Sequence, residues 1–289
     1  MLKEWPLVAF TIAGQMAVGV FLLAGIPLVM FFRPPANAAT LGTGLSVLAL
    51  VFVLLAAAAL VSFFHLHHPF RARYVLSNLR TSWLSREIFF ELGFMGLVAL
   101  AMVLVWTGST GGSLFKGVMA AAGLAGILFL VSMSKLYMLP TVPAWNQVYT
   151  PFIFFLTSLS LGALATGLIM GTGEWGAFPA GPFLILAFLS IAAEVAIAFF
   201  ISPGQGVFGG RPSPSLRPPA ETPRSLHPAR LAFLIAGLVL TGAALMAGNS
   251  RADHDPARDV LLVAALALVL AGQVVGRFLF YGLLTRPGR

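Results

Sequence analysis

Residues 65–91 read HLHHPFRARYVLSNLRTSWLSREIFFE, a polar stretch that stands between two long apolar runs. The stretch holds three of the five histidines, four of the seventeen basic residues and two of the nine acidic residues. Charged side chains are costly inside a bilayer. We therefore predict that the stretch lies at a membrane surface, and that the apolar runs on either side are the second and third membrane spans.

The composition of the whole chain favours the same class of protein. Of 289 residues, 59% are hydrophobic and 9% are charged, and the mean hydropathy is +0.95. Soluble domains carry about 25% charged residues, so we predict an all-α polytopic membrane protein. The absence of cysteine excludes disulfides and iron–sulfur ligation by this chain. The net charge of +8 suits membrane lipid or an acidic partner, and no segment resembles a nucleic-acid-binding module.

Eight apolar segments are long enough to cross a membrane, for which about 20 residues are needed. The predicted spans are residues 7–32, 43–66, 88–107, 115–138, 151–171, 180–201, 230–248 and 259–283. The first run is about 25 residues long, against roughly 7–15 in a signal peptide, so we expect it to be retained. An even number of spans puts both termini on one side of the membrane, which we call side A.

The predicted segment between the sixth and seventh spans, residues 202–229, is rich in Pro, Ser and Arg. We expect an irregular connector there. It divides the protein into a six-helix membrane region at 1–201, which contains the predicted site, and a C-terminal helix pair at 230–289.

Basic residues are concentrated on side A, with eleven there and four on the opposite side B. The positive-inside rule then places side A and both termini in the cytoplasm of a bacterial cell, with the spans in its inner membrane. A soluble partner docked on side A is a second explanation for these charges. The tryptophans all fall near predicted span ends, as an aromatic belt requires. They are Trp5, Trp83, Trp106, Trp145 and Trp175.

The ionisable residues predicted inside spans all fall in the half nearer side A. They are Glu91, Lys135, Glu194 and Arg277, accompanied by the neutral Gln15 and Gln273. A transmembrane ion or proton path needs polar groups at both depths, so this asymmetry favours a one-sided pocket. The alternative is that Glu194 pairs with Arg277 or Lys135 only to hold the helices together.

The polar stretch also contains the groups that quinol chemistry needs. His65 closes the second span before Pro69, and Ser85 is predicted to cap the third span with Glu87 in its first turn. Glu91 lies one turn deeper on the same face. Oxidation of a quinol releases two electrons and two protons, and a histidine and a carboxylate can accept these protons and pass them on.

Simpler interpretations of the histidines remain open. His65, His67 and His68 are also typical of interfacial residues that extend to the lipid headgroups. A bis-histidine haem is not favoured because His227 and His254 fall in predicted loops, and a zinc site lacks a further ligand beside the three clustered histidines. We expect neither haem nor metal in this protein.

Four ordered segments carry a family resemblance. They are Glu4-Trp5-Pro6-Leu7 with Phe10-Thr11 and Gly14-Gln15; His65-Leu66 with Pro69, Arg71-Ala72 and SWLSREI at 82–88; Tyr137 with TVPAW at 141–145 and Thr150-Pro151; and Ala271-Gly272 with Gly276-Arg277 and FYG at 280–282. With these segments, over nearly its whole length, the protein resembles the membrane-anchor subunits of dimethyl-sulfoxide-reductase-type molybdoenzymes. Anchors of cytoplasmic sulfite-oxidising complexes, of the sulfite dehydrogenase type, are the most similar variant.

The resemblance implies eight spans and a bound quinone or quinol, either menaquinone or ubiquinone. It also implies two partners docked on the side of the termini: a four-cluster iron–sulfur subunit and a molybdopterin catalytic subunit. The quinol-site histidine of the family corresponds to His65, and its important carboxylate corresponds to Glu87. The full predicted quinone site is His65, Arg71, Trp83, Ser85, Glu87, Glu91, Arg277 and Tyr281.

Two positions depart from the family pattern. His67 stands where a glycine often follows His-Leu, which reshapes the lip of the pocket. Gln273 replaces an acidic residue before the last Gly-Arg, which leaves the partner of Arg277 open, with Glu194 as a candidate. Two other functions remain as alternatives: a transporter or channel, and a purely structural anchor without a quinone site.

Overall fold

The computed structural model describes residues 4–25, 27, 38–63, 78–142, 145–172, 180–200, 226–247 and 256–282. Secondary structure in these ranges consists of helices joined by turns. The helices are α1 (Trp5–Val20), the π-helical turn η2 (Phe21–Gly25), α3 (Ala38–Phe63), α5 (Trp83–Trp106), α6 (Ser113–Tyr137), α7 (Tyr149–Thr172), α8 (Gly181–Phe200), α9 (Leu226–Ala247) and α10 (Pro256–Gly282).

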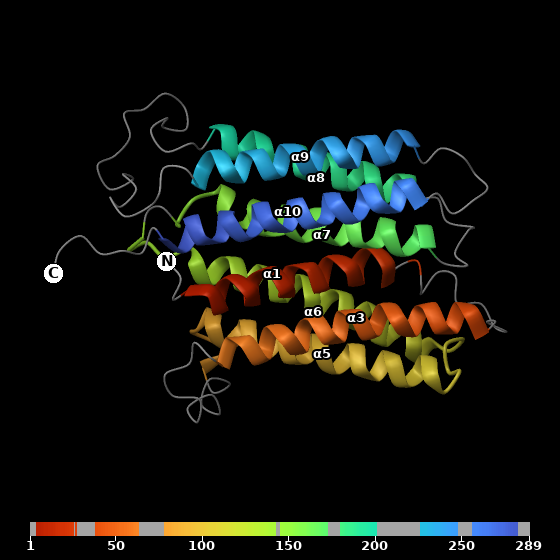
Figure 1. Ribbon diagram of the computed structural model, residues 1–289. Helices are drawn as coiled ribbons and strands as arrows, with labels where there is room; N and C mark the ends of the chain where they lie inside the picture. Colours follow the sequence, from red (N-terminus) through yellow and green to blue (C-terminus); the bar gives the residue numbers. More distant parts are fainter. Residues whose placement is uncertain are drawn as a thin grey trace.

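Within the described residues, eight helical segments are long and apolar enough to cross a membrane, with α1 and η2 forming one of them. Each overlaps one of the predicted spans, which confirms their number and the all-α class. Because eight is even, α1 begins and α10 ends at the same end of the bundle (Figure 1). We call this the A end, since it corresponds to the predicted side A.

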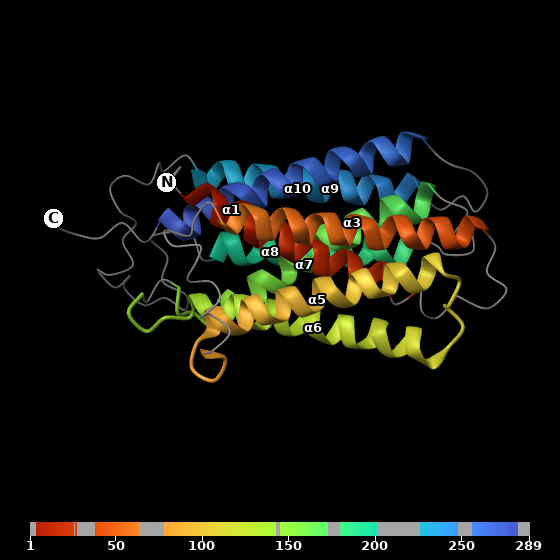
Figure 2. The same ribbon diagram turned by 90° about the horizontal axis from the view of Figure 1, so that it is seen from below.

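α1 and α7 form the centre of the bundle. In an 18-residue apolar window, 67% of the residues of the first span and 61% of those of α7 are buried, against 44% or less in the other spans. α1 contacts α3, α6, α7 and α10. Figures 1 and 2 both show α5 on one flank of the molecule and α9 on the other. α1 therefore lies between the two flanks and contacts helices on both sides.

α1 and α7 cross at very close range. A Cβ atom added to Gly162 would overlap the backbone of Gly19, and one added to Gly19 would overlap the carbonyl oxygen of Ser158. The two glycines let the helix backbones touch, as small residues do between membrane helices. Beside this crossing, the Ser158 hydroxyl donates to the carbonyl oxygen of Gln15 over 2.8 Å.

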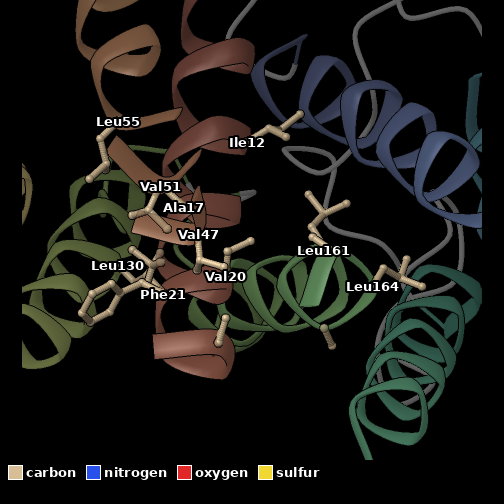
Figure 3. Close-up of a cluster of buried hydrophobic side chains, with 14 of the residues drawn as sticks. Ile12, Ala17, Val20, Phe21, Val47, Val51, Leu55, Leu130, Leu161 and Leu164 are labelled. Atoms are coloured by element: carbon tan, nitrogen blue, oxygen red, sulfur yellow. The ribbon is translucent and has the colours of Figure 1, made fainter. Parts of the chain in front are cut away.

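The apolar core lies mainly between α1, α3, α6 and α7, and Figure 3 shows part of it. The labelled side chains are Ile12, Ala17, Val20, Phe21, Val47, Val51, Leu55, Leu130, Leu161 and Leu164. In a bilayer this packing stabilises the bundle through van der Waals contact, because lipid tails are as apolar as the side chains. The core lies next to the polar groups of the A end and limits how they can move.

α5 begins at Trp83, earlier than the predicted start at residue 88. Ser82 is the N-cap, and its hydroxyl accepts a hydrogen bond from the Ser85 N–H over 3.3 Å. The prediction that Ser85 caps this helix with Glu87 in the first turn is therefore wrong. The sequence offers a serine at both positions, and the earlier one fits because a helix at a membrane surface extends beyond its apolar segment.

α9 begins at Leu226, so the last four residues of the predicted connector 202–229 are helical. Residues 201–225 lie outside the described residues, and the division of the protein into a six-helix region, a connector and a helix pair stays a prediction. Trp106, at the end of α5, is 81% exposed and fits an aromatic belt. Trp145 differs, because it is buried within the A end rather than facing the membrane surface.

Candidate functional site

α10 presents three polar side chains on one face near the A end. Gln273, Arg277 and Tyr281 are spaced by four residues, so they lie one above another along the helix. Their exposed fractions are only 2%, 3% and 1%. We call these three residues the α10 stripe. Each contacts other helices, so the position of α10 fixes much of the site.

Arg277 lies in the middle of the stripe. Its Nη2 donates to Gln15 Oε1 on α1 over 2.9 Å, and its guanidinium carbon lies 3.8 Å from the centre of the Phe154 ring. Among the described residues it forms no ion pair, with Glu194 or with any other carboxylate. In the same ranges Glu194 does not pair with Lys135 either, so the simple interhelical ion pair considered from the sequence is not formed. Arg277 is a buried cation balanced by an amide and a ring.

Tyr281 begins a row of hydroxyl groups at the A end. Its hydroxyl lies 3.4 Å from Thr11 Oγ1 on α1, and its ring lies 5.4 Å from the ring of Tyr137 on α6. Thr11 is one turn before Gln15, so successive turns of α1 face successive residues of the α10 stripe. The side chains of three helices, α1, α6 and α10, therefore meet at one level.

Trp145 closes this group from the loop between α6 and α7. Its Nε1 donates to the Phe280 carbonyl oxygen over 2.7 Å, and its ring stacks on the Phe280 ring at 5.2 Å and 13°. The edge of Tyr137 meets Trp145 at 5.5 Å and 86°. These rings make a rigid apolar wall beside the hydroxyl groups.

Glu87 and Glu91 approach the same region from α5, and their side chains are 1% and 4% exposed. The Oε1 atom of each carboxyl has no hydrogen-bond partner among the described residues. Glu87 interacts electrostatically with Glu91 and with the hydroxyls of Tyr137 and Tyr281. A buried polar atom without a partner is costly. This part of the site is therefore suited to a bound molecule that donates hydrogen bonds.

Glu194 on α8 forms a separate cluster around Gln273, which lies one turn before Arg277 on the α10 stripe. One of its oxygens accepts from Gln273 Nε2, and the other accepts from Ser160 Oγ over 3.0 Å. Thr157 Oγ1 lies 3.1 Å from Gln273 Oε1. Arg230 on α9 interacts with Glu194 electrostatically. Unlike Glu87 and Glu91, this carboxyl has partners on both oxygens.

Half of the predicted quinone-site residues come together at the A end: Glu87, Glu91, Arg277 and Tyr281. His65 and Arg71 lie outside the described residues, as do His67 and His68. The roles of His65 and Arg71 in binding stay predictions.

Trp83 and Ser85 lie in the first turn of α5. Trp83 is 38% exposed, and the Arg86 guanidinium lies 4.2 Å from the centre of its ring. Arg86 also fastens the preceding turn, because it donates to the Leu79 and Arg80 carbonyl oxygens over 2.8 and 2.6 Å. Ser85 is buried. Both residues help to start the helix that carries Glu87, and a direct role in binding stays a prediction.

The sequence-based site omits three residues that the structure places beside it: Thr11, Tyr137 and Trp145. Each stands in one of the four segments that carry the family resemblance, so a signal was present. Nothing in the spacing along the sequence shows that α1, α6 and the following loop meet α10. Within the described ranges, no three His, Asp or Glu side chains are grouped as metal ligands. The expectation of no haem or metal stays a prediction, since the clustered histidines lie outside those ranges.

Comparison with known proteins agrees with this architecture. The sequence is 29% identical over 287 residues to the YnfH subunit of an anaerobic dimethyl sulfoxide reductase of Escherichia coli (strain K12), covering 97% of this protein and 94% of that one. It is 26% identical over 286 residues to the C subunit of the anaerobic dimethyl sulfoxide reductase of the same organism, with the same coverage. The C subunit of the Haemophilus influenzae enzyme is 31% identical over 163 residues, which are 56% of this protein and 57% of that one.

A family model described as DMSO reductase anchor subunit (DmsC) matches residues 1–283. The match covers all eight described spans and every residue of the A-end site. This multi-pass membrane protein therefore belongs to the DMSO reductase anchor subunit (DmsC) family.

Proposed function

We propose that this protein binds a quinone or quinol at the A end, where two electrons and two protons are exchanged with the quinone pool. The observation that carries the proposal is the pair of buried carboxyls, Glu87 and Glu91, each with an oxygen that lacks a partner among the described residues. The Tyr137 and Tyr281 hydroxyls stand beside them. A cluster of polar groups of this kind next to an aromatic wall suits a flat ring with two oxygens.

The roles follow from the chemistry of these groups. Glu87 accepts a proton from a quinol hydroxyl, or returns one to a quinone, with Glu91 as the next carboxyl. His65 is proposed as the second proton-exchanging group. Arg277 stabilises negative charge that develops on a ring oxygen, because its own charge has no carboxylate partner in the described residues. Arg71, Trp83 and Ser85 are proposed to form the surface side of the site.

The electrons must pass to another protein, because this one contains no cysteine for an iron–sulfur cluster and is proposed to hold no haem or metal. The relatives are named as parts of multi-subunit reductases. We propose a four-cluster iron–sulfur subunit docked at the A end, which serves a molybdopterin catalytic subunit. A sulfite dehydrogenase-type partner, as the SWLSREI segment favours, would send electrons into the quinone rather than out of the quinol.

The excess of basic residues on side A supports a cytoplasmic location for both termini and for the docked partners, in a bacterial inner membrane. A transporter or channel is disfavoured, because the buried charged residues of the described ranges all lie in the A half: Glu87, Glu91, Glu194 and Arg277. A purely structural anchor does not account for two buried carboxyl oxygens that have no partners in those ranges.

The test uses the assembled complex in lipid nanodiscs, with turnover of a quinol analogue and binding of a fluorescent quinone-analogue inhibitor as measurements. His65→Ala and Glu87→Gln should leave the complex assembled and lower turnover by about 100-fold, the size of a lost proton-transfer group. Asp259→Asn is the matched control, since it removes a carboxylate at the other end of α10. Wild-type turnover in both site variants, or no analogue binding by the wild type, contradicts the proposal.

A further inference from the structure

Glu194 is a buried carboxyl to which the proposed proton exchange gives no part. Its side chain is 1% exposed, and both oxygens accept hydrogen bonds, from Gln273 and from Ser160. A carboxyl with both oxygens satisfied is not poised for a ligand. Glu194 is nevertheless connected to the site, because its partner Gln273 is on the same helix face as Arg277 and Tyr281.

Gln273 joins three helices at one point. Its amide nitrogen donates to Glu194 on α8, and its amide oxygen lies 3.1 Å from the Thr157 hydroxyl on α7. The Thr157 hydroxyl is shared with the Ile153 carbonyl oxygen of its own helix, 2.9 Å away, so the bond to Glu194 is the main restraint. α10 cannot rotate or slide without breaking this buried hydrogen bond. We call the Glu194–Gln273–Thr157 group the α10 clamp.

The clamp controls the groups that face the substrate. Arg277 and Tyr281 follow Gln273 at intervals of four residues on the same face. A helix moves as a rigid element, so a rotation that frees Gln273 also moves Arg277 away from Gln15 and Tyr281 away from Tyr137. The distances at the site, such as the 2.9 Å from Arg277 Nη2 to Gln15 Oε1, therefore depend on a contact outside it.

Two cations, Arg230 on α9 and Arg277 on α10, interact electrostatically with Glu194. Arg230 of α9 lies against Gly276, where an added Cβ atom would be 2.7 Å from Arg230 Nε. Neither cation forms an ion pair with Glu194 within the described residues, so the hydrogen bonds to Gln273 and Ser160 are the direct contacts of its carboxyl there.

We propose that Glu194 is a positioning residue of the quinone site. Through its hydrogen bond with Gln273 it fixes the rotational position of α10, so that Arg277 and Tyr281 face Glu87. This inference rests on the proposed function. Glu194 touches neither substrate nor reacting atoms, and its effect on the reaction is transmitted through the α10 stripe.

The decisive variant is the double substitution Glu194→Met with Gln273→Met. Replacing both partners of a buried hydrogen bond with apolar side chains of similar size is close to neutral for stability, so the complex should assemble. The clamp is nevertheless lost. We expect the Kd of the fluorescent quinone analogue and the KM for quinol to rise by about tenfold or more, since misplacement of about 1 Å has effects of this order or larger.

The single variant Glu194→Gln provides the rescue. A carboxamide oxygen still accepts from Gln273, so we expect Kd within about twofold of the wild type. Thr241→Val is the matched control, because Thr241 is equally buried and its hydroxyl bonds, within the described residues, only to the Gly237 carbonyl of its own helix. Kd and KM should not change in this variant.

The outcomes separate the two proposals. If the wild type binds the analogue and the double variant binds it equally well, the clamp is wrong while the quinone site stands. If Glu194→Gln weakens binding as much as the double variant, the charge of Glu194 matters rather than the clamp, and the positioning role is also wrong. Absence of analogue binding by the wild type instead contradicts the proposed function itself.

Discussion

Two buried carboxyl environments lie at the A end, and they differ in one respect. Glu87 and Glu91 each have an oxygen with no hydrogen-bond partner among the described residues, whereas both oxygens of Glu194 are bonded. All three side chains are less than 5% exposed, so burial does not distinguish them. The difference shows that burial alone does not indicate the role of a charged residue in a membrane span. Its hydrogen-bond partners must be known as well.

The contrast also indicates different roles for the α5 carboxyls and for Glu194. The α5 carboxyls stand beside hydroxyl groups and aromatic rings, a setting in which a substrate can complete the hydrogen bonding. Glu194 stands where protein groups already do so. We therefore expect the α5 carboxyls to control turnover and Glu194 to control stability and geometry.

The largest effect is expected when alanine replaces Glu194 and, in a second variant, Glu87, which tests the comparison directly. Both substitutions leave a cavity of similar size. Glu194→Ala also removes the acceptor of the Gln273 amide, whereas Glu87→Ala removes an oxygen that has no partner in the described structure. We therefore expect Glu194→Ala to lower the free energy of unfolding by about 2 kcal/mol more than Glu87→Ala. Thermal unfolding of both variants in the same lipid, followed by loss of helical signal, measures this difference. A greater loss in Glu87→Ala would reverse the two roles.

Arg277→Lys tests whether Arg277, in the middle of the α10 stripe, acts in turnover as Glu87 does or in stability as Glu194 does. Lysine keeps the charge but not the planar contact with Gln15 and Phe154, so we expect turnover to fall about tenfold with little change in unfolding temperature. Arg258→Lys, near the other end of the same helix, is the control. Loss of stability without loss of turnover would place Arg277 with the clamp.

Tyr137→Phe sharpens the assignment of the hydroxyl groups beside Glu87. The ring contacts with Trp145 and Tyr281 are kept and only one hydroxyl is removed, so we expect about a fivefold fall in kcat/KM, equivalent to one ordinary hydrogen bond. Tyr149→Phe, at the start of α7, supplies the comparison. Steady-state kinetics with a quinol analogue should show the difference, and equal values for the two variants would remove Tyr137 from the site.

The smallest effect is expected at Gly276. An added methyl group meets the flexible end of Arg230 rather than backbone, so the side chain can move aside. Alanine is also the better helix former by roughly 0.5–1 kcal/mol. The two terms oppose each other, and we expect the Kd of the quinone analogue in Gly276→Ala to stay within about twofold. A tenfold change would show that the place of Arg230 is fixed more tightly than the clamp requires.

The spans could be predicted from the sequence because they depend on a local property, the length of each apolar run. The second predicted span, 43–66, and the observed Gly42–Ser62 segment show how close this comes. The start of α5 was predicted less well, because hydropathy cannot separate a polar helical turn at the surface from a loop. Ser82 and Ser85 are chemically equivalent caps, and the backbone alone decides between them.

The partners of the buried groups could not be predicted, because they depend on which helices meet. Gln15 and Arg277 are separated by most of the sequence, yet they are bonded over 2.9 Å. Glu194 was considered as the partner of Arg277 on charge alone, and the structure gives it Gln273 instead. Gln273, which replaces an acidic residue of the family pattern, provides the amide that contacts Glu194 on α8 and Thr157 on α7.

The position of the α10 stripe in the sequence has a consequence for biosynthesis. α10 follows the other described spans in the sequence, and it supplies partners for Gln15, Thr157 and Glu194, which are made long before it. Until α10 inserts, these side chains sit in the bilayer without the bonds that the finished protein gives them. A polypeptide that stops before residue 256 lacks Gln273, Arg277 and Tyr281 and cannot form the site. Insertion of α10 is therefore the step on which a working site depends.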